Sequence, residues 1–472
     1  MTTAVVIGGG PNGLAAGLRL ARAGVDVTVL EARDEVGGGA RSGELEVPGV
    51  IHDHCSAVHP LGVGSPFWQE IGLDRYGLQW AWPEIDCTHP LDDGDIGVLH
   101  QSIEETAAGL GVDGRRWKLA FGDIVRGFDE LAPDLLRPIV NVPRHPFRLA
   151  AFGPRALLPA TMMARLFATP AARALYAGVA AHGFTRLDTP MTAALGIMIT
   201  ASGHRFGWPV AVGGSGAITR AAADALLDLG GTIETGVMIS DRSQIPDADL
   251  VMLDLSASQA LSLYGDRMPD RIAKAYGRYR VGSSAFKVDF VIRGDIPWRN
   301  PESARAGTVH LGGDLAEVAY TEKQRAAGVL VENPFVLVGQ QYLADPSRSS
   351  GDLNPIWSYA HVPPGFDGDA TEAVIRQIER FAPGFRDTIV ATTSTGTMAL
   401  EQYNPNYAAG DIIGGANTGL QTILRPRLAL DPYATGVDGV YLCSQSAPPG
   451  AGIHGLCGMH AADSALRSIG RR

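Results

Sequence analysis

The chain has 472 residues, more than one hydrophobic core usually organises, so two or three domains are expected. Its formal net charge of −11 leaves no basic excess to neutralise phosphates, which excludes nucleic acid as a general partner. Its four cysteines are too few and too scattered for a disulfide framework and form no metal-binding cluster, so a reducing compartment and no metal site are predicted.

The first predicted element is a strand, TAVVIG, at residues 3–8. It begins almost at Met1, so we expect no signal or transit peptide. No uncharged apolar run approaches the roughly 20 residues of a membrane-spanning helix. We therefore expect a cytoplasmic protein, with peripheral association at the inner membrane face as an alternative.

A glycine motif typical of dinucleotide-binding domains follows this strand. Gly8, Gly10 and Gly13 form G-x-G-x-x-G before a helical run, and the next strand, DVTVLE, ends in the acidic Glu31. Gly8 permits the tight turn, Gly10 lets the backbone approach a pyrophosphate, and Gly13 lets the helix pack against the strand. Glu31 is placed to accept hydrogen bonds from a ribose.

A second glycine cluster, in ARDEVGGGARSGE, comes directly after this acid, where NAD domains rarely have one. Together, VVIGGGPNGLAAGLRLARAG and EARDEVGGGARS resemble the flavoprotein superfamily of amine oxidases and phytoene desaturases. The segments PGVIHDHCSAVHPLGVGSPF, FKVDFVIRGDIPW, YNPNYAAGDIIGG and YLCSQSAPPGAGIHGLCGMHAA resemble its phytoene dehydrogenase-related branch. The resemblance runs from one end of the chain to the other.

The resemblance implies one FAD, bound without a covalent link, with the second glycine cluster along its diphosphate. The residues expected to bind it are Gly8, Gly10, Pro11, Asn12, Gly13, Glu31, Ala32, Arg33, Gly38, Gly39, Ala40, Arg41, Val237, Ser444, His454, Gly455 and Leu456. Val237 is expected at the adenine side. The helix that begins near Gly455 is expected to face the pyrimidine end of the flavin, where its positive dipole end would stabilise negative charge.

Two further G-x-G-x-x-G motifs have different interpretations. The motif at Gly109 follows a helical pattern, SIEETAAGLG, and is predicted to be a helix end and loop. The motif at Gly450 lies between a predicted strand and helix, but no later strand follows it to complete a second nucleotide-binding unit. Its alternative role is a glycine turn needed only for packing. One cofactor is therefore predicted.

The predicted fold class is α/β, with a discontinuous Rossmann-type FAD-binding domain, a mixed-sheet substrate domain and a helical subdomain. The FAD-binding domain is assigned to residues 1–73, 205–264 and 398–472. The substrate domain is assigned to residues 74–134 and 265–397, and the helical subdomain to residues 135–204.

The helical subdomain contains an unusual charge pattern. From Leu135 to Leu187 there is no Asp, Glu or Lys, but there are seven arginines set among apolar residues. This composition suits a peripheral membrane surface or an oligomer interface, because arginines contact headgroups and aliphatic side chains reach the acyl boundary. The alternative is a helical unit whose arginines pair with acids elsewhere in the protein.

Three residues are candidates for catalysis. Lys287 lies in a stretch that resembles the amine oxidase segment in which a lysine holds water against flavin N5; the alternative is a lysine paired with Asp289. His54 and His59 occupy a segment that runs close to the isoalloxazine in the related proteins. They would act as acid or base, or would only orient the backbone.

These features favour an FAD-dependent oxidoreductase that desaturates carbon–carbon bonds of a hydrophobic small molecule such as a polyene, isoprenoid or lipid. An amine oxidase is disfavoured, because Gly452, Ile453 and Leu456 stand where aromatic residues would cage a cationic substrate. The same features also suit a redox-neutral isomerase or saturase of a similar substrate, or a non-catalytic interaction protein that holds FAD.

Overall fold

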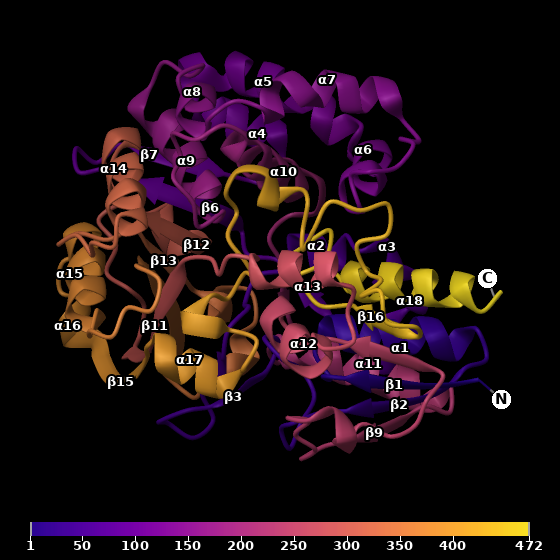
Figure 1. Ribbon diagram of the computed structural model, residues 1–472. Coiled ribbons are helices and arrows are strands. Elements are labelled where there is room, and N and C mark those ends of the chain that lie inside the picture. The colour runs from indigo at the N-terminus through magenta and orange to yellow at the C-terminus, as the bar shows by residue number, and fades with distance from the viewer. Residues whose placement is uncertain (1, 471–472) are drawn as a thin grey trace.

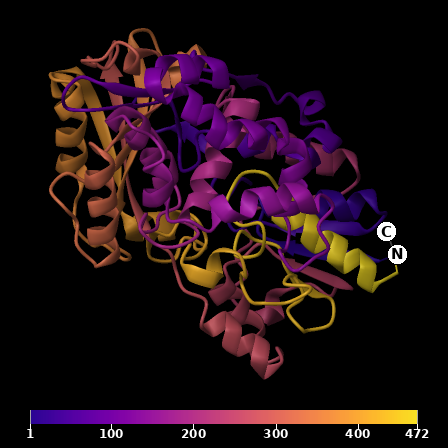
Figure 2. The ribbon, with the colours of Figure 1, turned by 90° about the horizontal axis from the view of Figure 1, so that it is seen from above.

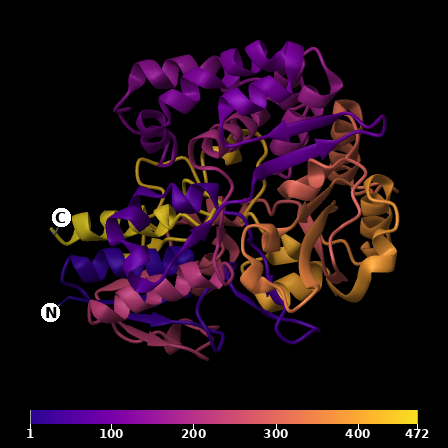
Figure 3. The same ribbon diagram turned by 180° about the vertical axis from the view of Figure 1, so that it is seen from behind.

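The structure is a computed structural model that describes residues 2–470. Two main β-sheets and a layer of helices make up the molecule (Figure 1). The sheet at the lower right of Figure 1 lies next to both ends of the chain, and a larger sheet lies at the left. Helices of residues 103–206 lie across the top in this view and also when the molecule is seen from behind (Figure 3).

The five-stranded sheet is parallel and has the order β16-β10-β1-β2-β9. Its strands are β1 (Thr3–Ile7), β2 (Asp26–Leu30), β9 (Thr232–Glu234), β10 (Leu250–Leu253) and β16 (Val440–Leu442). These strands come from the start, the middle and the end of the sequence. The central β1 pairs with β2 on one side and β10 on the other, as in a Rossmann-type fold.

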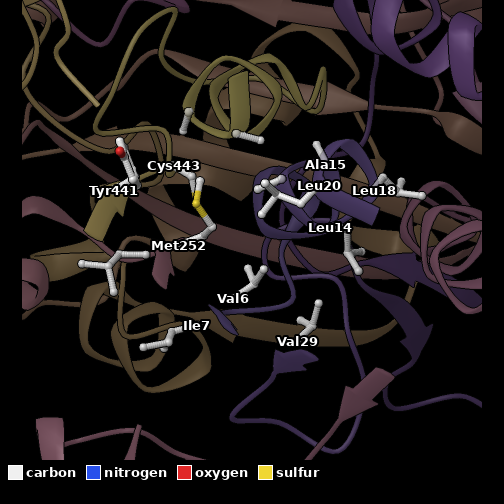
Figure 4. Close-up of a cluster of buried hydrophobic side chains, with 14 of the residues drawn as sticks. Val6, Ile7, Leu14, Ala15, Leu18, Leu20, Val29, Met252, Tyr441 and Cys443 are labelled. Atoms are coloured by element: carbon white, nitrogen blue, oxygen red, sulfur yellow. The ribbon is translucent and has the colours of Figure 1, made fainter. Parts of the chain in front are cut away.

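One face of this sheet is covered by α1 (Pro11–Arg22), α11 (Gly216–Asp228) and α18 (Leu456–Ser468). Two further helices, α12 (Ala257–Tyr264) and α13 (Asp270–Gly277), follow β10 in the sequence. Helices α1 and α18 approach closely at Gly458, where an added Cβ would collide with the carbonyl oxygen of Asn12. Strand residues such as Val6 and Met252 form the core with Leu14 of α1 (Figure 4). This packing gives the C-terminal helix its place beside the first helix of the chain.

The seven-stranded sheet is mixed and has the order β15-β11-β14-β13-β12-β6-β7. Only β6 and β12 are parallel neighbours. The strands are β6 (Ile85–Pro90), β7 (Ile96–Leu99), β11 (Ser284–Arg293), β12 (Ala306–Leu311), β13 (Val336–Gly339), β14 (Leu353–Val362) and β15 (Ile389–Thr395). The predicted mixed sheet is confirmed.

Both faces of this sheet are buried. Helix α15 (Thr371–Phe381) covers one face, whereas α9 (Pro170–Ala181) and α14 (Leu315–Ala326) cover the other. Side chains of β14 alternate accordingly: Ile356 packs toward α15, and Tyr359 packs toward α9. The sheet is therefore held between α15 on one face and α9 and α14 on the other.

The helical layer begins earlier in the sequence than residue 135. Its helices are α4 (Ile103–Gly109), α5 (Gly114–Arg126), α6 (Phe128–Leu135), α7 (Pro146–Ala156), α8 (Ala160–Ala164), α9 and α10 (Thr192–Phe206). Trp117 of α5 packs against Phe121 and against Phe167, so α5 shares a core with the later helices. The motif at Gly109 lies between α4 and α5, which confirms a helix end there. Seen from above, the layer lies over both sheets (Figure 2).

The arginine-rich segment is partly neutralised by carboxylates. Arg137, Arg148, Arg155 and Arg186 form ion pairs with Asp134, Glu130, Asp123 and Asp188, respectively. Apolar side chains of the same segment are exposed, with Phe147 89% and Leu157 63% accessible. A peripheral membrane surface or an oligomer interface stays a prediction for this segment. Among residues 2–470, no helix is both long and apolar enough to cross a membrane.

Short elements join the two sheets. They are β3 (Ser42–Glu44), β4 (Ile51–Asp53), α2 (Pro60–Val63), α3 (Pro66–Ile71), β5 (Trp80–Ala81), β8 (Val210–Ala211) and α17 (Thr397–Tyr403), whereas α16 (Phe385–Thr388) lies beside α15. The buried Arg348 connects β4 and β8, because its guanidinium contacts the carboxylates of Asp53 and Asp345 and donates to the carbonyl oxygen of Ala211. This network connects the segments that lead out of the five-stranded sheet to the seven-stranded sheet.

Candidate dinucleotide-binding site

A cavity of about 320 Å³ opens at the carboxyl ends of β1, β2 and β10. This edge is where open α/β sheets bind their ligands. The predicted residues that line it are Gly8, Gly10, Pro11, Asn12, Glu31, Ala32, Arg33, Gly38, Gly39, Arg41, Val237 and Ser444. The structure therefore brings the first glycine motif, the second glycine cluster and two distant segments to one site.

The turn between β1 and α1 forms the floor of the cavity. Gly8 has a φ of +103°, a conformation that favours glycine. At Gly10 an added Cβ would lie 2.7 Å from Oδ2 of Asp254, and at Gly13 it would collide with the carbonyl oxygen of Gly8. Gly13 lies behind the cavity wall and permits the close packing of helix on strand. Only a backbone without side chains leaves the space above this turn open.

Glu31 lies at the end of β2 and orients the turn. Its Oε2 accepts a hydrogen bond from the Gly9 amide at 2.7 Å, and its Oε1 accepts one from the Arg33 amide at 2.9 Å. Each carboxylate oxygen has a second lone pair that can accept from a hydroxyl group. The Val237 amide donates to the Glu31 carbonyl oxygen at 2.8 Å, which places residue 237 at the same end of the cavity.

The second glycine cluster packs against the first. An added Cβ at Gly38 would lie 3.1 Å from the Gly10 Cα, and one at Gly39 would collide with the hydroxyl group of Tyr407. The Arg41 guanidinium lies 4.2 Å from the centre of the Tyr403 ring and donates to the Tyr403 hydroxyl at 3.1 Å. Tyr403 and Tyr407 also line the cavity. They belong to the YNPNY segment, to which the sequence analysis assigned no residue role.

Asp254 is a third cavity residue that was not predicted from the sequence. It follows the apolar strand β10 directly, and its Oδ2 accepts a hydrogen bond from the Gly13 amide at 2.9 Å. Burial raises the pKa of Asp254 to about 7, and the nearby Glu31 carboxylate adds to the rise. Asp254 could have been recognised in the sequence as a polar residue directly after an apolar strand, at the edge where parallel sheets bind ligands.

Substitution of Asp254 by Asn is expected to change how stability depends on pH. An unfolded chain releases this proton near the usual pKa of 3.8, whereas the folded protein holds it up to about pH 7. The free energy of unfolding therefore falls as the pH rises between these values, by at most about 1.4 kcal/mol per pH unit. Asp254→Asn removes this loss and keeps an acceptor for the Gly13 amide.

Urea unfolding of the ligand-free protein at pH 5, 6, 7 and 8 measures this effect. The stability of Asp254→Asn relative to the wild type should increase up to about pH 7 and then level off. A difference that is constant across this range would contradict the interpretation.

The C-terminal glycine motif lies between β16 and α18, as predicted. Gly452 and Ile453 line the cavity, whereas His454, Gly455 and Leu456 lie outside its wall. Nδ1 of His454 accepts a hydrogen bond from the Leu456 amide at 3.0 Å and so caps the first turn of α18. Burial lowers the pKa of His454 to about 4, which keeps the ring neutral.

Cys457 does not have the environment of a reactive thiol. It is fully buried, and its thiol donates to the Gly450 carbonyl oxygen at 3.3 Å. Burial raises its pKa to about 12. A cofactor attachment through this residue is disfavoured, because the thiolate is the nucleophile.

Lys287 lies on β11 and forms a buried ion pair with Asp289 two residues further on. Both side chains are nearly inaccessible, and Nδ1 of His52 lies 3.5 Å from the other Asp289 oxygen. Lys287 does not line the cavity. The expected alternative, pairing with Asp289, is therefore present in the structure. A role beside flavin N5 stays a prediction.

The two candidate histidines occupy different environments, and neither lines the cavity. Nε2 of His59 lies 2.7 Å from the Ser215 hydroxyl, and burial lowers the pKa of His59 to about 4. The half-buried His54 has a ring 5.7 Å from that of Tyr403, and burial lowers its pKa too. The acid–base roles of both histidines stay predictions. The contact between His59 and Ser215 joins two segments that are far apart in the sequence.

Metal ligands do not gather in the described part of the chain. Among residues 2–470, no group of three or more His, Cys, Asp or Glu side chains is placed to hold a metal ion.

The cavity fits a dinucleotide. Its floor is glycine backbone at the N-terminus of α1, where the positive end of the helix dipole attracts a diphosphate. A carboxylate acceptor stands at the end of β2, and the guanidinium groups of Arg33 and Arg41 line the wall. The amide oxygen of Asn12 is buried without a hydrogen-bond partner among the described residues, so a ligand donor there would satisfy it.

Comparison with known proteins supports this assignment. Residues 6–70 match the model of the NAD(P)-binding Rossmann-like domain family. The chain is 26% identical to hydroxyneurosporene desaturase of Cereibacter sphaeroides, over 99% of this chain and 98% of that protein. It is 30% identical to one subunit of the limonene dehydrogenase of Castellaniella defragrans over 135 residues, which span 28% of this chain and 24% of that protein.

The fold also agrees with solved structures. A variant of putrescine oxidase superposes with a TM-score of 0.63 and 16% identity over 100% of both chains. An oxidoreductase of Methanosarcina mazei superposes with a TM-score of 0.62 and 16% identity over 99% of this chain and 100% of that one. These likenesses confirm the α/β fold with a Rossmann-type domain. The relatives above, a desaturase and a subunit of a dehydrogenase, support the resemblance of the chain to phytoene-desaturase-like flavoproteins.

Proposed function

We propose that the protein holds FAD without a covalent link and transfers hydrogen to or from a carbon–carbon bond of a hydrophobic substrate. The observation that carries this proposal is the cavity at the carboxyl ends of β1, β2 and β10, where two glycine clusters touch and the Glu31 carboxylate lies at the end of β2. Similarity to a desaturase over almost the whole chain supports the choice of reaction.

Each group of residues would have a separate role in binding the cofactor and the substrate. The first turn of α1 and Arg41 would hold the diphosphate, and Glu31 would hold a ribose. Bound FAD supplies hydride chemistry. The turn of residues 452–453 would lie against the flavin, and the seven-stranded sheet and helical layer would exclude water from the substrate.

An amine is not the expected substrate. The cavity turn carries Gly452 and Ile453, and neither side chain can contribute to an aromatic cage around a cation. Isomerisation or saturation of a similar hydrophobic molecule uses the same cofactor and site. A protein that holds FAD only for folding would show the same cavity but no turnover.

Anaerobic mixing tests the proposal. The protein reconstituted with FAD should lose its visible flavin absorbance when phytoene or another isoprenoid polyene in detergent is added, and the polyene should gain a double bond. Rearranged polyene without bleaching would identify an isomerase. Neither change, across polyene and acyl substrates, would contradict an enzymatic role for the flavin.

Pyridine nucleotides should not reduce the flavin quickly. The described chain contains one parallel sheet of the Rossmann type, and its glycine motifs at both ends serve the same cavity. Stopped-flow mixing with NADH or NADPH is therefore expected to show no reduction faster than about one turnover per second, a slow rate for an enzyme step. Faster reduction would require a second nucleotide site.

A further inference from the structure

A second, larger cavity lies outside the dinucleotide site. It has a volume of about 830 Å³ and is formed where α3, α6 and α18 meet, with residues 430–433 at one side. Helices α3 and α6 lie above α18 in Figure 1. The turn before α18 separates the two cavities, because Ile453 lines the first and Leu456 lines the second. No role described above uses this second cavity.

Its wall is mainly apolar. The apolar side chains include Phe67, Phe128, Leu136, Phe206, Leu456 and Met459. They come from α3, α6, α10 and α18 and from the residue after α6, so the apolar surface is continuous across elements far apart in sequence. A cavity of this size with an apolar wall and a few polar groups is typical of small-molecule sites.

The acids that line the cavity are already engaged. Glu70, Asp129 and Asp463 form ion pairs with Arg22, Arg205 and Arg19. Asp431 accepts hydrogen bonds from the hydroxyl group of Ser464 and from the Tyr433 amide. Glu70, Asp129 and Asp463 are therefore neutralised by ion pairs, whereas Asp431 accepts only from uncharged groups and keeps its charge.

Two arginines at the cavity have no such partner. No carboxylate within residues 2–470 forms an ion pair with Arg144 or with Arg467. A third, Arg137, pairs with Asp134 but keeps its buried Nε without a hydrogen-bond partner in the described part of the protein. The cavity thus combines an apolar wall with unneutralised guanidinium groups, which bind carboxylate and phosphate groups well.

We infer that this second cavity binds a single-chain amphiphile, whose apolar chain lies between α6 and α18 and whose carboxylate or phosphate head contacts Arg144 and Arg467. The chain gains free energy by leaving water, and the head supplies the charge that the two arginines lack. This inference goes beyond the proposed function, because the site is separate from the dinucleotide cavity and its occupancy requires no flavin chemistry.

Calorimetric titration of the purified protein tests the inference with four probes that separate head from chain. These are decanoate, decyl phosphate, decanol and inorganic phosphate. We expect one equivalent of decanoate or decyl phosphate to bind about tenfold or more tightly than decanol, because a hydrogen bond to a charged group is worth about one tenfold step in affinity. Inorganic phosphate alone should not saturate the site.

Variants at the two unpaired arginines identify the site. Arg144→Gln and Arg467→Gln should each weaken the anionic amphiphile about tenfold and leave decanol binding unchanged. Arg165→Gln is the matched control, because Arg165 belongs to the same helical layer, has no ion pair with a described residue and does not line the cavity. The affinity of this control for all four probes should equal that of the wild type.

Three results would overturn the inference. Equal affinity for decanol and decanoate would show that the arginines do not recognise the head. Saturable binding of inorganic phosphate with no gain from a chain would show a free anion site. Binding of decanoate that is unchanged in both Arg144→Gln and Arg467→Gln would place the amphiphile elsewhere. Because binding is measured without turnover, failure of the proposed desaturase activity would not affect these outcomes.

Discussion

The variant Gly10→Val is expected to lose FAD while the protein stays folded. Gly10 has an extended backbone that valine tolerates, with φ of −72° and ψ of 175°. Its side chain would enter the cavity, where an added Cβ already lies 2.7 Å from Oδ2 of Asp254. Overpacking costs about 1–3 kcal/mol, so affinity should fall at least about ten- to a hundredfold.

Titration of ligand-free protein with FAD, followed by quenching of flavin fluorescence, measures this loss. Gly109→Val is the matched control, because Gly109 opens the middle glycine motif and an added Cβ there meets no atom within 4 Å. The control should bind FAD like the wild type. Equal affinity of Gly10→Val and the wild type would show that the diphosphate does not pass over this turn.

The variant Lys287→Met is expected to destabilise the fold strongly. At an exposed site the loss of the Lys287–Asp289 pair would cost at most about 1 kcal/mol. The pair is buried instead, because Lys287 is only 3% exposed, as is its partner Asp289. Removal of one partner leaves a buried charge, which costs about 3–5 kcal/mol.

The double variant Lys287→Met/Asp289→Leu separates the ion pair from any further role of the lysine. It should recover most of the lost free energy of unfolding, measured by urea denaturation, because an apolar pair often replaces a buried ion pair without loss. No recovery would show that Lys287 stabilises the protein through different contacts.

The same double variant tests the predicted role near flavin N5. If Lys287 holds water or a proton there, reoxidation of dithionite-reduced flavin by oxygen should slow about ten- to a thousandfold even though stability is restored. Reoxidation at the wild-type rate would remove Lys287 from the flavin site and leave only its structural role.

Local patterns predicted the first βαβ unit well. Strand β1, the three glycines, α1 and β2 follow one another within residues 3–30, so their contacts depend on neighbouring residues. The helix at Leu456 was predicted for the same reason. The start of the helical layer was placed too late, because Trp117 joins it through contacts with residues about 50 positions away.

The partners at the candidate site could not be predicted in the same way. Asp254 reaches Gly13 across 241 positions, and Tyr403 reaches Arg41 across 362. Sequence periodicity gives no information about such pairs, because it describes only which face of an element is buried. Lys287 and Asp289 were recognised as neighbours on one face, but their burial depends on β14 and β15, which lie on either side of β11.

The sequence by itself predicted the class of cofactor and the place where its phosphates would bind, because a glycine turn between a strand and a helix acts through its own backbone. Only the tertiary structure decided which charges are neutralised. It pairs Lys287 with Asp289 in the interior. The acids that line the second cavity form ion pairs or hydrogen bonds, whereas Arg144 and Arg467 have no carboxylate partner within residues 2–470. The physical reason is that a charge is compensated by groups close in space, and the chain brings those groups together only when it folds.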